Sequence, residues 1–499
     1  MAQGRARLTA MAALLVSLAA CKAGPDYQRP AVATPAAYKE LAGWKPSQPQ
    51  DAMSRGPWWS VYRDPVLDGL EQQVQVSNQN LRAAEAAYRA AVAVVRAAEA
   101  ALFPTLTLNG QSTRSKSSAR GSGTSLGGAQ QPVSQYELTL GASWDIDLWG
   151  RIRRTIEGNI ASAQATAADL ASARLSAQAA LATAYLQLRV EDALKKLLED
   201  AATAYTRSLE IVRNKYNAGT AARSDVAQAE TQLESTQAQA INVGVQRAQL
   251  EHAIAVLIGK PPADFAIAPV ATLAPEIPAM PPGVPSALLE RRPDVAAAER
   301  QVAAANAQIG VAIAAYYPDL TLSASVGYLS NQMASLFQAS NRLWSLGPQA
   351  AETVLDFGAR GAQVDQARAN YDQGVANYRQ TVLAAFQQVE DELAALRILA
   401  DQAKVQAVAV RSAQEAERLI FNQYKAGTVD FTSVVTAEVA ALSNEETALN
   451  IVQSRLVASV ALIQALGGGW DASRLPRTKE VNPGPFSTAP AKPVKTSQE

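Results

Sequence analysis

The feature that most constrains this chain is a long internal duplication. The turn Tyr-x-Ala-Gly-Thr occurs at residues 216–220 and again at 424–428, which is 208 residues later (424 − 216). The motif Phe/Tyr-Pro-x-Leu-Thr-Leu occurs at 103–108 and at 317–322, a separation of 214 (317 − 103). Two landmarks that recur at nearly constant separation indicate one structural unit used twice.

Each half opens with a helix-forming segment in which apolar residues recur every seven positions. Alanine fills the core positions between them, and alanine is the best helix former and lets helices approach closely. A seven-residue period predicts coiled-coil packing. The matched stripes are Leu81, Tyr88, Val95 and Leu102 in the first half, and Val295, Val302, Ile309 and Tyr316 in the second.

A strand-forming segment follows each of these helices. Residues 136–148 and 320–328 alternate, with apolar side chains at even positions and polar residues or glycine at odd positions. A period of two over about ten residues fits one transmembrane β-hairpin per half, although a soluble hairpin with one buried face would alternate in the same way. A fourth strand is expected within 342–357, where Pro348 interrupts it.

Four strands are too few for a closed barrel, because single-chain outer-membrane barrels begin at eight. An open edge in lipid would leave backbone groups unpaired at a cost of several kcal/mol each. Copies of the chain must therefore share a barrel, with eight strands for two copies and twelve for three. Asp145 and Asp147, on the polar face of the second strand, are either solvated carboxylates or lumen-facing acidic residues that bias ion passage.

Two long segments without proline follow the hairpins. They lie between Pro132 and Pro261 and between Pro348 and Pro476. Each is expected to hold an outgoing helix, the turn and a returning helix. A helix over about 151–216 would measure ~95 Å at ~1.5 Å per residue. This length far exceeds one bilayer and suits a rod that crosses the periplasm.

The turn residues predict how these helices end and restart. Gly219 and Gly427 are expected to adopt the left-handed conformation that ends an outgoing helix. Asp225 and Ser433, again 208 residues apart (433 − 225), are candidate N-caps of the returning helices.

The N-terminal residues have the pattern of a secretory signal. Two arginines precede the apolar run of residues 8–18, and Leu-Ala-Ala-Cys ends at Cys21. This pattern is typical of a bacterial lipobox, in which the cysteine carries a covalent diacylglycerol; an ordinary cleavage site is the alternative. Lys22, where inner-membrane retention would require aspartate, indicates the outer membrane. Later segments do not reach the ~18 consecutive apolar residues of a membrane helix, so strands are expected to make the crossing.

Composition argues against several function classes. The formal net charge is zero, which gives no sign of a nucleic-acid partner. One histidine (His252) and one cysteine are too few for an ordinary zinc or copper site, so neither a metal nor a cofactor is expected. Gly-Thr-Ser-Leu-Gly at 123–127 fits a nucleophile elbow but lies in a Gly/Ser-rich loop without a histidine partner, so we do not expect an enzyme. A phosphate-binding loop is also absent from the sequence, which indicates a passive conduit.

Several local motifs together resemble the TolC/NodT-like family of outer-membrane efflux channel lipoproteins, over nearly the whole mature chain. They are Cys-Lys-Ala-Gly-Pro-Asp-Tyr-Gln-Arg-Pro (21–30), Trp-Trp-Ser-Val-Tyr-Arg-Asp-Pro-Val-Leu (58–67), Asp-Leu-Trp-Gly-Arg (147–151), Leu-Ile-Gly-Lys-Pro-Pro (257–262), Leu-Leu-Glu-Arg-Arg-Pro-Asp-Val-Ala-Ala-Ala-Glu (288–299) and the two Tyr-x-Ala-Gly-Thr turns.

The resemblance implies an α+β membrane channel: a long coiled-coil helical barrel below a transmembrane β-barrel that protomers share, four strands each. It implies a homotrimer that is anchored in outer-membrane lipid and extends into the periplasm. Its implied role is the exit duct of a tripartite pump that exports small toxic compounds and drugs. The implied partners are a periplasmic adaptor and an inner-membrane transporter of RND type. A type I protein-secretion duct, a heavy-metal efflux duct and, more distantly, a non-conducting coiled-coil lipoprotein are the alternatives.

The resemblance places the gate at the periplasmic tip. Tyr424 matches a tip tyrosine that holds the closed state through hydrogen bonds between helices. Several members of the family carry aspartates six and nine residues after the turn glycine, which form acidic rings. This chain has Ser433 and Thr436 there, so the ring is absent or moved to Asp430. Asp225 is either a helix cap or a pore-lining acid. The tip candidates are Tyr216, Gly219, Arg223, Asp225, Tyr424, Gly427 and Asp430.

The expected organisation follows from these segments. Asp64 is expected to cap the first helix, with Pro65 at its first position. The segments are a signal peptide (1–20), a lipid-anchored segment (21–64), a first repeat (65–258, hairpin about 104–148, tip 216–225), a Pro-rich linker (259–287), a second repeat (288–467, hairpin about 319–357, tip 424–433) and a tail (468–499).

Overall fold

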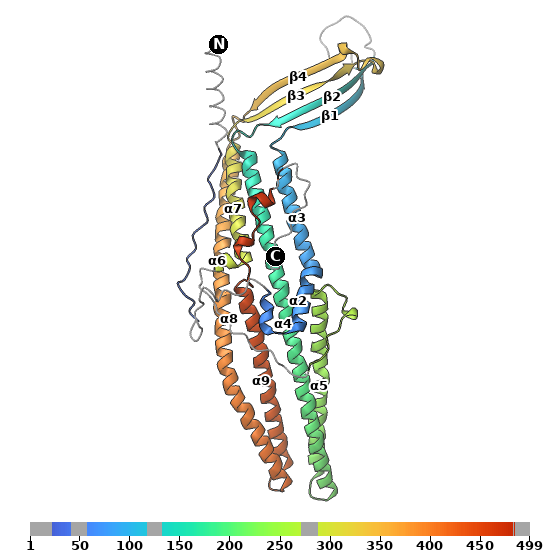
Figure 1. Cartoon of the computed structure of the whole chain (residues 1–499), viewed down its shortest axis with the longest axis vertical. Coiled ribbons are helices and arrows are strands. Elements are labelled where there is room, and N and C mark those ends of the chain that lie inside the picture. Colours follow the sequence, from blue (N-terminus) through green and yellow to red (C-terminus); the bar gives the residue numbers. More distant parts are fainter. Residues whose placement is uncertain (1–21, 41–56, 117–131, 271–287, 483, 485–499) are drawn as a thin grey trace.

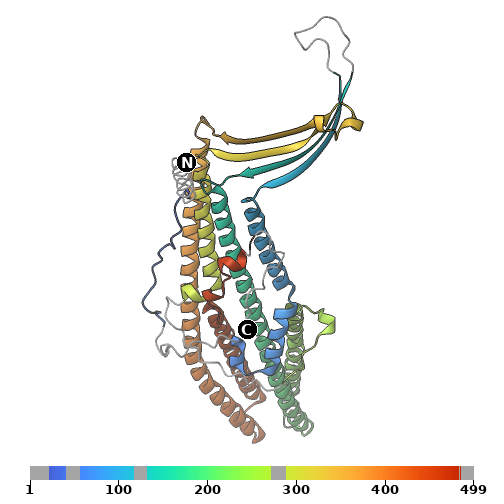
Figure 2. The ribbon, with the colours of Figure 1, turned by 45° about the horizontal axis from the view of Figure 1, so that its top comes forward.

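The computed structural model describes residues 22–40, 57–116, 132–270, 288–482 and 484. The described chain is a long rod of helices with a four-stranded sheet at one end (Figure 1). The sheet is curved and leans away from the rod (Figure 2). Cys21, its signal segment and the loop at 123–127 lie outside the described residues.

The elements of the two halves correspond one to one. The first half holds α3 (Gln79–Ala100), β1 (Thr105–Ser115), β2 (Val133–Asp145), α4 (Arg151–Asn217) and α5 (Arg223–Leu257). The second holds α7 (Pro293–Ala314), β3 (Asp319–Ser330), β4 (Arg342–Ala351), α8 (Ala359–Lys425) and α9 (Phe431–Ala465). Both α4 and α8 have 67 residues, and both α5 and α9 have 35. The expected helical hairpins are therefore present in both halves.

Shorter elements lie before, between and after the two halves, and between β3 and β4. Asp64 caps α2 as expected, because its Oδ1 accepts hydrogen bonds from the backbone N–H groups of Val66 (2.9 Å) and Leu67 (3.2 Å). The short elements are η1 (Trp58–Tyr62), α2 (Pro65–Ser77), η2 (Pro262–Asp264), α6 (Leu288–Arg291), η4 (Met333–Ser335), η5 (Ala339–Asn341), η6 (Ala472–Arg474) and α10 (Thr478–Val481).

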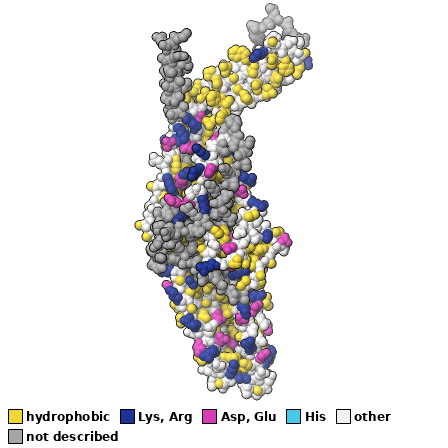
Figure 3. All heavy atoms as spheres, in the orientation of Figure 1, with side chains coloured by type: hydrophobic (Ala, Val, Ile, Leu, Met, Phe, Trp, Pro, Cys, Tyr) yellow, Lys and Arg dark blue, Asp and Glu magenta, His cyan; other side chains and the backbone are white. Residues whose placement is uncertain are grey.

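The sheet is antiparallel, in the order β1-β2-β3-β4. Leu108 pairs with Leu140, Leu140 with Val326, and Val326 with Trp344. Paired residues of an antiparallel sheet share a face, so the apolar positions of all four strands form one surface. That surface is exposed, as the apolar side chains over the sheet show in Figure 3. Pro348 is tolerated inside β4 because β4 is an edge strand.

The helices form a single curved layer. α4 runs along its middle and packs on α3 and α7 near the sheet and on α5 and α9 further away. α8 packs on α7 and α9, so α8 bounds one side of the layer and α3 with α5 bounds the other. Of the described helices, α9 is long and apolar enough by composition to cross a membrane. Its buried Val434, Leu442 and Leu456 pack inside this layer, which accounts for that composition.

Residues 22–40 form an N-terminal strap that lies along the outside of α4, α7 and α8. The guanidinium of Arg154, only 1% exposed, donates hydrogen bonds to the carbonyls of Ala23 (2.8 Å) and Gly24 (2.9 Å). Gly24 has φ +82° and a Cβ there would lie 2.5 Å from Cα of Gly310, so only glycine permits this approach. The strap is thus fixed to the rod close to the sheet.

Candidate gate at the tip of the helical hairpins

The two turns at the far end of the rod have the same backbone. Gly219 (φ +75°) and Gly427 (φ +76°) adopt the left-handed conformation, as predicted. Thr220 donates from its backbone N–H (2.9 Å) and its hydroxyl (3.0 Å) to the carbonyl of Lys215. Thr428 makes the same two bonds at the second tip. The Gly-Thr pair therefore supplies the left-handed residue and the donors that a helix C-terminus needs.

The predicted N-caps of the returning helices were wrong. Asp225 and Ser433 are the third helical residues of α5 and α9, not their caps. Asp430 caps α9, where its Oδ1 accepts from the backbone N–H (3.0 Å) and the hydroxyl (2.7 Å) of Ser433. These bonds lower the pKa of Asp430. Asp225 instead accepts weakly from the N–H of Ala222 at 3.4 Å.

The two tip tyrosines are not equivalent. Tyr424 is 4% exposed, whereas Tyr216 is 41% exposed. Nζ of Lys215, from the first hairpin, lies 4.1 Å from the ring centroid of Tyr424 and donates to its carbonyl at 2.5 Å. The ring of Phe431 meets Tyr424 edge-on at 5.3 Å. Tyr424 therefore joins the first hairpin to the second.

Within the described residues, the hydroxyl of Tyr424 does not make the hydrogen bond between helices that the resemblance implies. It is buried and has no hydrogen-bond partner among the described residues. Burial, and then the negative charge of Asp225, raise the pKa of Tyr424. The link between hairpins is carried by Lys215, which the sequence interpretation missed. The sequence feature that could have indicated this role is a lysine in the last turn of a helix, where a cation can bind the unpaired carbonyl groups.

Arg223 and the hydroxyl residues Ser433 and Thr436 complete the tip. Arg223 begins α5 and faces solvent. Thr436 donates its hydroxyl to the carbonyl of Thr432 (2.9 Å), and Ser433 is held by Asp430. The two positions at which the resemblance implies acidic rings are thus occupied by neutral hydroxyl groups. The Asp430 carboxylate contacts the first of them, Ser433.

The two candidate acidic residues near β2, Asp145 and Asp147, lie in different environments. Asp145 is the last residue of β2 and accepts a hydrogen bond from the hydroxyl of Thr321 at 2.8 Å. Asp147 lies beyond the strand, which corrects its assignment to the strand's polar face. It accepts from the N–H groups of Ile152 and Arg153 (both 2.9 Å) and pairs with the Arg153 guanidinium. Its side chain is 8% exposed, so it anchors the start of α4.

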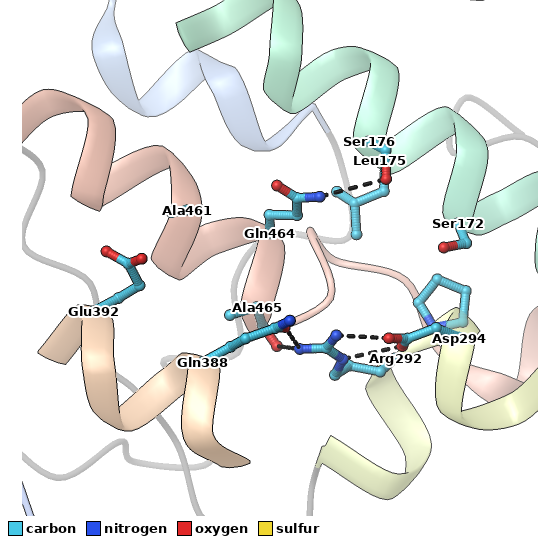
Figure 4. A pocket seen from close by; sticks show the side chains of 11 residues that line it. Ser172, Leu175, Ser176, Arg292, Asp294, Gln388, Glu392, Ala461, Gln464 and Ala465 are labelled. Atoms are coloured by element: carbon cyan, nitrogen blue, oxygen red, sulfur yellow. Dashed lines mark hydrogen bonds and ion pairs between the residues drawn. The ribbon is translucent and has the colours of Figure 1, made fainter. Parts of the chain in front are cut away.

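A recess of about 410 Å³ lies where α4, α7, α8 and α9 meet (Figure 4). Arg292 fills one side of it and is fully engaged by Asp294 (2.6 Å), the side-chain oxygen of Gln388 (2.9 Å) and the carbonyl of Ala465 (3.0 Å). These contacts tie the start of α7 to the end of α9. Among the described residues no group of three or more His, Cys, Asp or Glu side chains could hold a metal ion. His252 is an exposed helix residue.

Comparisons with known proteins agree with this architecture. The family described as outer membrane efflux protein matches residues 70–260 and 284–468. The antibiotic efflux pump outer membrane protein ArpC and the toluene efflux pump outer membrane protein TtgC, both of Pseudomonas putida, are each 32% identical to this chain over 466 residues, which is 93% of this chain and 96% of theirs. The solved outer-membrane channel OprN superposes with a TM-score of 0.84 at 30% identity, over 90% of this chain and all of OprN.

Proposed function

Because this chain belongs to the outer membrane efflux protein family, we propose that it is the passive exit duct of a tripartite pump and works as a homotrimer. Its place as an outer-membrane efflux component follows from the family. The finer proposal is carried by one observation: the free edges of the sheet and the free sides of the helical layer lie on the same two sides of the chain.

The two free sides of the chain can pack against each other in neighbouring copies. β1 and β4 are the free edges of the sheet; β1 continues from α3, and β4 leads into α8. The helices on those sides expose apolar side chains, with Ile241 78% exposed on α5 and Val405 72% exposed on α8. If β1 and α5 of one copy pack on β4 and α8 of the next, every edge is paired once the ring closes. Three copies give the twelve strands that the resemblance implies.

The first test is the mass of the full-length protein in detergent. Light scattering, corrected for bound detergent, should give three times the mass of the mature chain that begins at Cys21. Ile398→Asp with Val405→Asp on α8 should shift the protein towards monomer, because two charges would be buried without partners in the contact. Val439→Asp, an equally apolar exposed position on the inner helix α9, should leave the trimer intact. A dimer, or equal effects of both changes, would contradict the arrangement.

The pump must supply the energy. The chain carries no phosphate-binding loop in its sequence, so transport is driven by an inner-membrane transporter, of RND type, that a periplasmic adaptor joins to the tip. The cargo is a set of small toxic compounds; relatives are named for antibiotic and toluene efflux. The tip candidates form the constriction that docking opens, with Tyr424 and its Lys215 contact as the central part.

The lipid anchor is supported by the place of the strap. Lys22 lies against Gly150, at the junction of β2 and α4, and forms an ion pair with Glu157. The residue after Cys21 is thus held at the end of the rod next to the sheet, where the membrane would begin. A diacylglycerol on Cys21 would reach the same leaflet that the sheet enters.

The anchor predicts a clear labelling result. Cys21→Ser should abolish incorporation of radiolabelled palmitate, because Cys21 is the one cysteine in the sequence and lipoprotein acylation requires a cysteine there. The strap contacts of Arg154 should still allow the unlabelled chain to fold. Lys22→Ala, which keeps the thiol, is the matched control and should retain the label. Label on the Cys21→Ser protein would disprove the lipobox interpretation.

A further inference from the structure

A buried carboxyl group bridges the two hairpins above the tip. Glu438 lies on α9, 11 residues after Gly427 (438 − 427), and is 4% exposed. The hydroxyl of Ser208, on α4, donates to its Oε1 at 2.8 Å. The hydroxyl of Tyr205, one turn earlier on α4, donates to the backbone carbonyl of Glu438 at 3.3 Å. Because α4 belongs to the first hairpin and α9 to the second, these bonds cross the boundary that must open if the hairpins part.

The surroundings of this carboxyl group disfavour a negative charge. The pKa of Glu438 is raised to about 7, mainly by burial. The hydrogen bond from Ser208 lowers this pKa, and the negative charge of Glu417 on α8 raises it further. α4 contributes the titratable Tyr205, and α5 contributes the neutral Gln232, which bonds to Tyr205. Glu445, on α9 itself, also acts on Glu417. Among the described residues that act on this carboxyl group none is a cation.

We propose that Glu438 is a latch of the closed tip: its neutral carboxyl group holds α9 against α4, and its ionisation releases the second hairpin from the first. The proposal rests on the proposed function, because a latch has meaning only in a duct whose tip opens. Tyr424 and Lys215 join the hairpins at the turn itself, and Glu438 joins them about three turns further up.

The direction of the pH effect follows from linkage. The carboxyl group has a pKa of about 7 when latched and near its ordinary value of 4.5 when released into water. The latch is therefore at full strength below about pH 4.5, weakens as the pH rises, and is lost above about pH 7. Between these limits each pH unit favours release by about tenfold per protomer.

The test uses the purified full-length protein in planar bilayers, with the pH on the tip side varied from 5.5 to 8. The open fraction should rise by about tenfold or more over this range. Glu438→Gln keeps an acceptor for Ser208 but cannot ionise, so its channel should stay closed at every pH. Glu415→Gln, which changes an exposed carboxylate of α8 paired with Arg418, is the matched control and should behave like the parent.

One further variant separates titration from a purely structural role. Glu417→Gln removes the neighbouring negative charge, so the midpoint should move to lower pH. A flat parent profile, or a profile that Glu438→Gln leaves unchanged, overturns the latch. If the protein conducts at no pH, even when Lys215 and Tyr424 are both replaced by alanine, the proposed duct function is wrong rather than the latch.

Discussion

Alanine at both Lys215 and Tyr424 should turn a closed tip into a leaking one. The double change removes a cation–π contact and a charged hydrogen bond between the hairpins. Such contacts contribute about 0.5–2 and about 1.5–3 kcal/mol. Since Lys215 is half-exposed, we expect the lower part of these ranges, and an open fraction that rises by roughly 10- to 100-fold. Single-channel recording and uptake of large antibiotics by cells that produce the variant would measure it.

The duplicated turn provides control variants for the double alanine change. Tyr216→Ala changes the same position of the other turn, but this ring is exposed and is expected to give a far smaller effect. Tyr424→Phe should also change little, because the hydroxyl has no hydrogen-bond partner in the described chain. If Tyr424→Phe opened the tip as far as the double alanine variant, the hydroxyl would be the essential group and the role assigned to Lys215 would be wrong.

The gate thus illustrates what the sequence could and could not predict. The heptads, the alternation and the left-handed glycines depend on residues near one another in the chain. These predictions were confirmed, except that Leu102 and Tyr316, the last members of the heptad stripes, lie just beyond α3 and α7. Lys215 and Tyr424 are 209 residues apart, and Ser208 and Glu438 are 230 apart. The first contact joins the corresponding helices α4 and α8, and the second joins α4 to α9. Both cross from one half of the chain to the other, so neither the repeat nor a periodicity within one half encodes them.

The errors have equally local causes. The cap of α9 was misplaced because Asp430 and Ser433 both have side chains suited to a cap, and only the first helical residue decides between them. Asp147 was assigned to a strand because the alternation continues beyond the last paired residue, Asp145. There the same polar side chain meets the free N–H groups of α4 instead.

Gly467→Ala should be the most damaging single change in the helical layer. Gly467 ends α9 with φ +92°, and a Cβ there would lie 2.0 Å from the carbonyl oxygen of Arg291. The neighbouring Arg292 ties α7 to α9 through the carbonyl of Ala465, so this contact cannot relax without breaking that ion-pair network. Left-handed strain and overpacking each cost about 1–3 kcal/mol. We expect the assembled protein to dissociate about 10 °C lower on heating, if it assembles at all.

Gly427→Ala is the matched control, because Gly427 has a similar φ of +76° but nothing within 4 Å of its Cβ. It should cost only about 1 kcal/mol, from left-handed strain alone. Asparagine separates the two causes, since it tolerates the left-handed conformation but still carries a Cβ. Gly427→Asn should therefore behave almost like the parent, whereas Gly467→Asn should fail like Gly467→Ala. Equal heat stability of the two asparagine variants would show that the contact with Arg291 does not hold α9 against the start of α7.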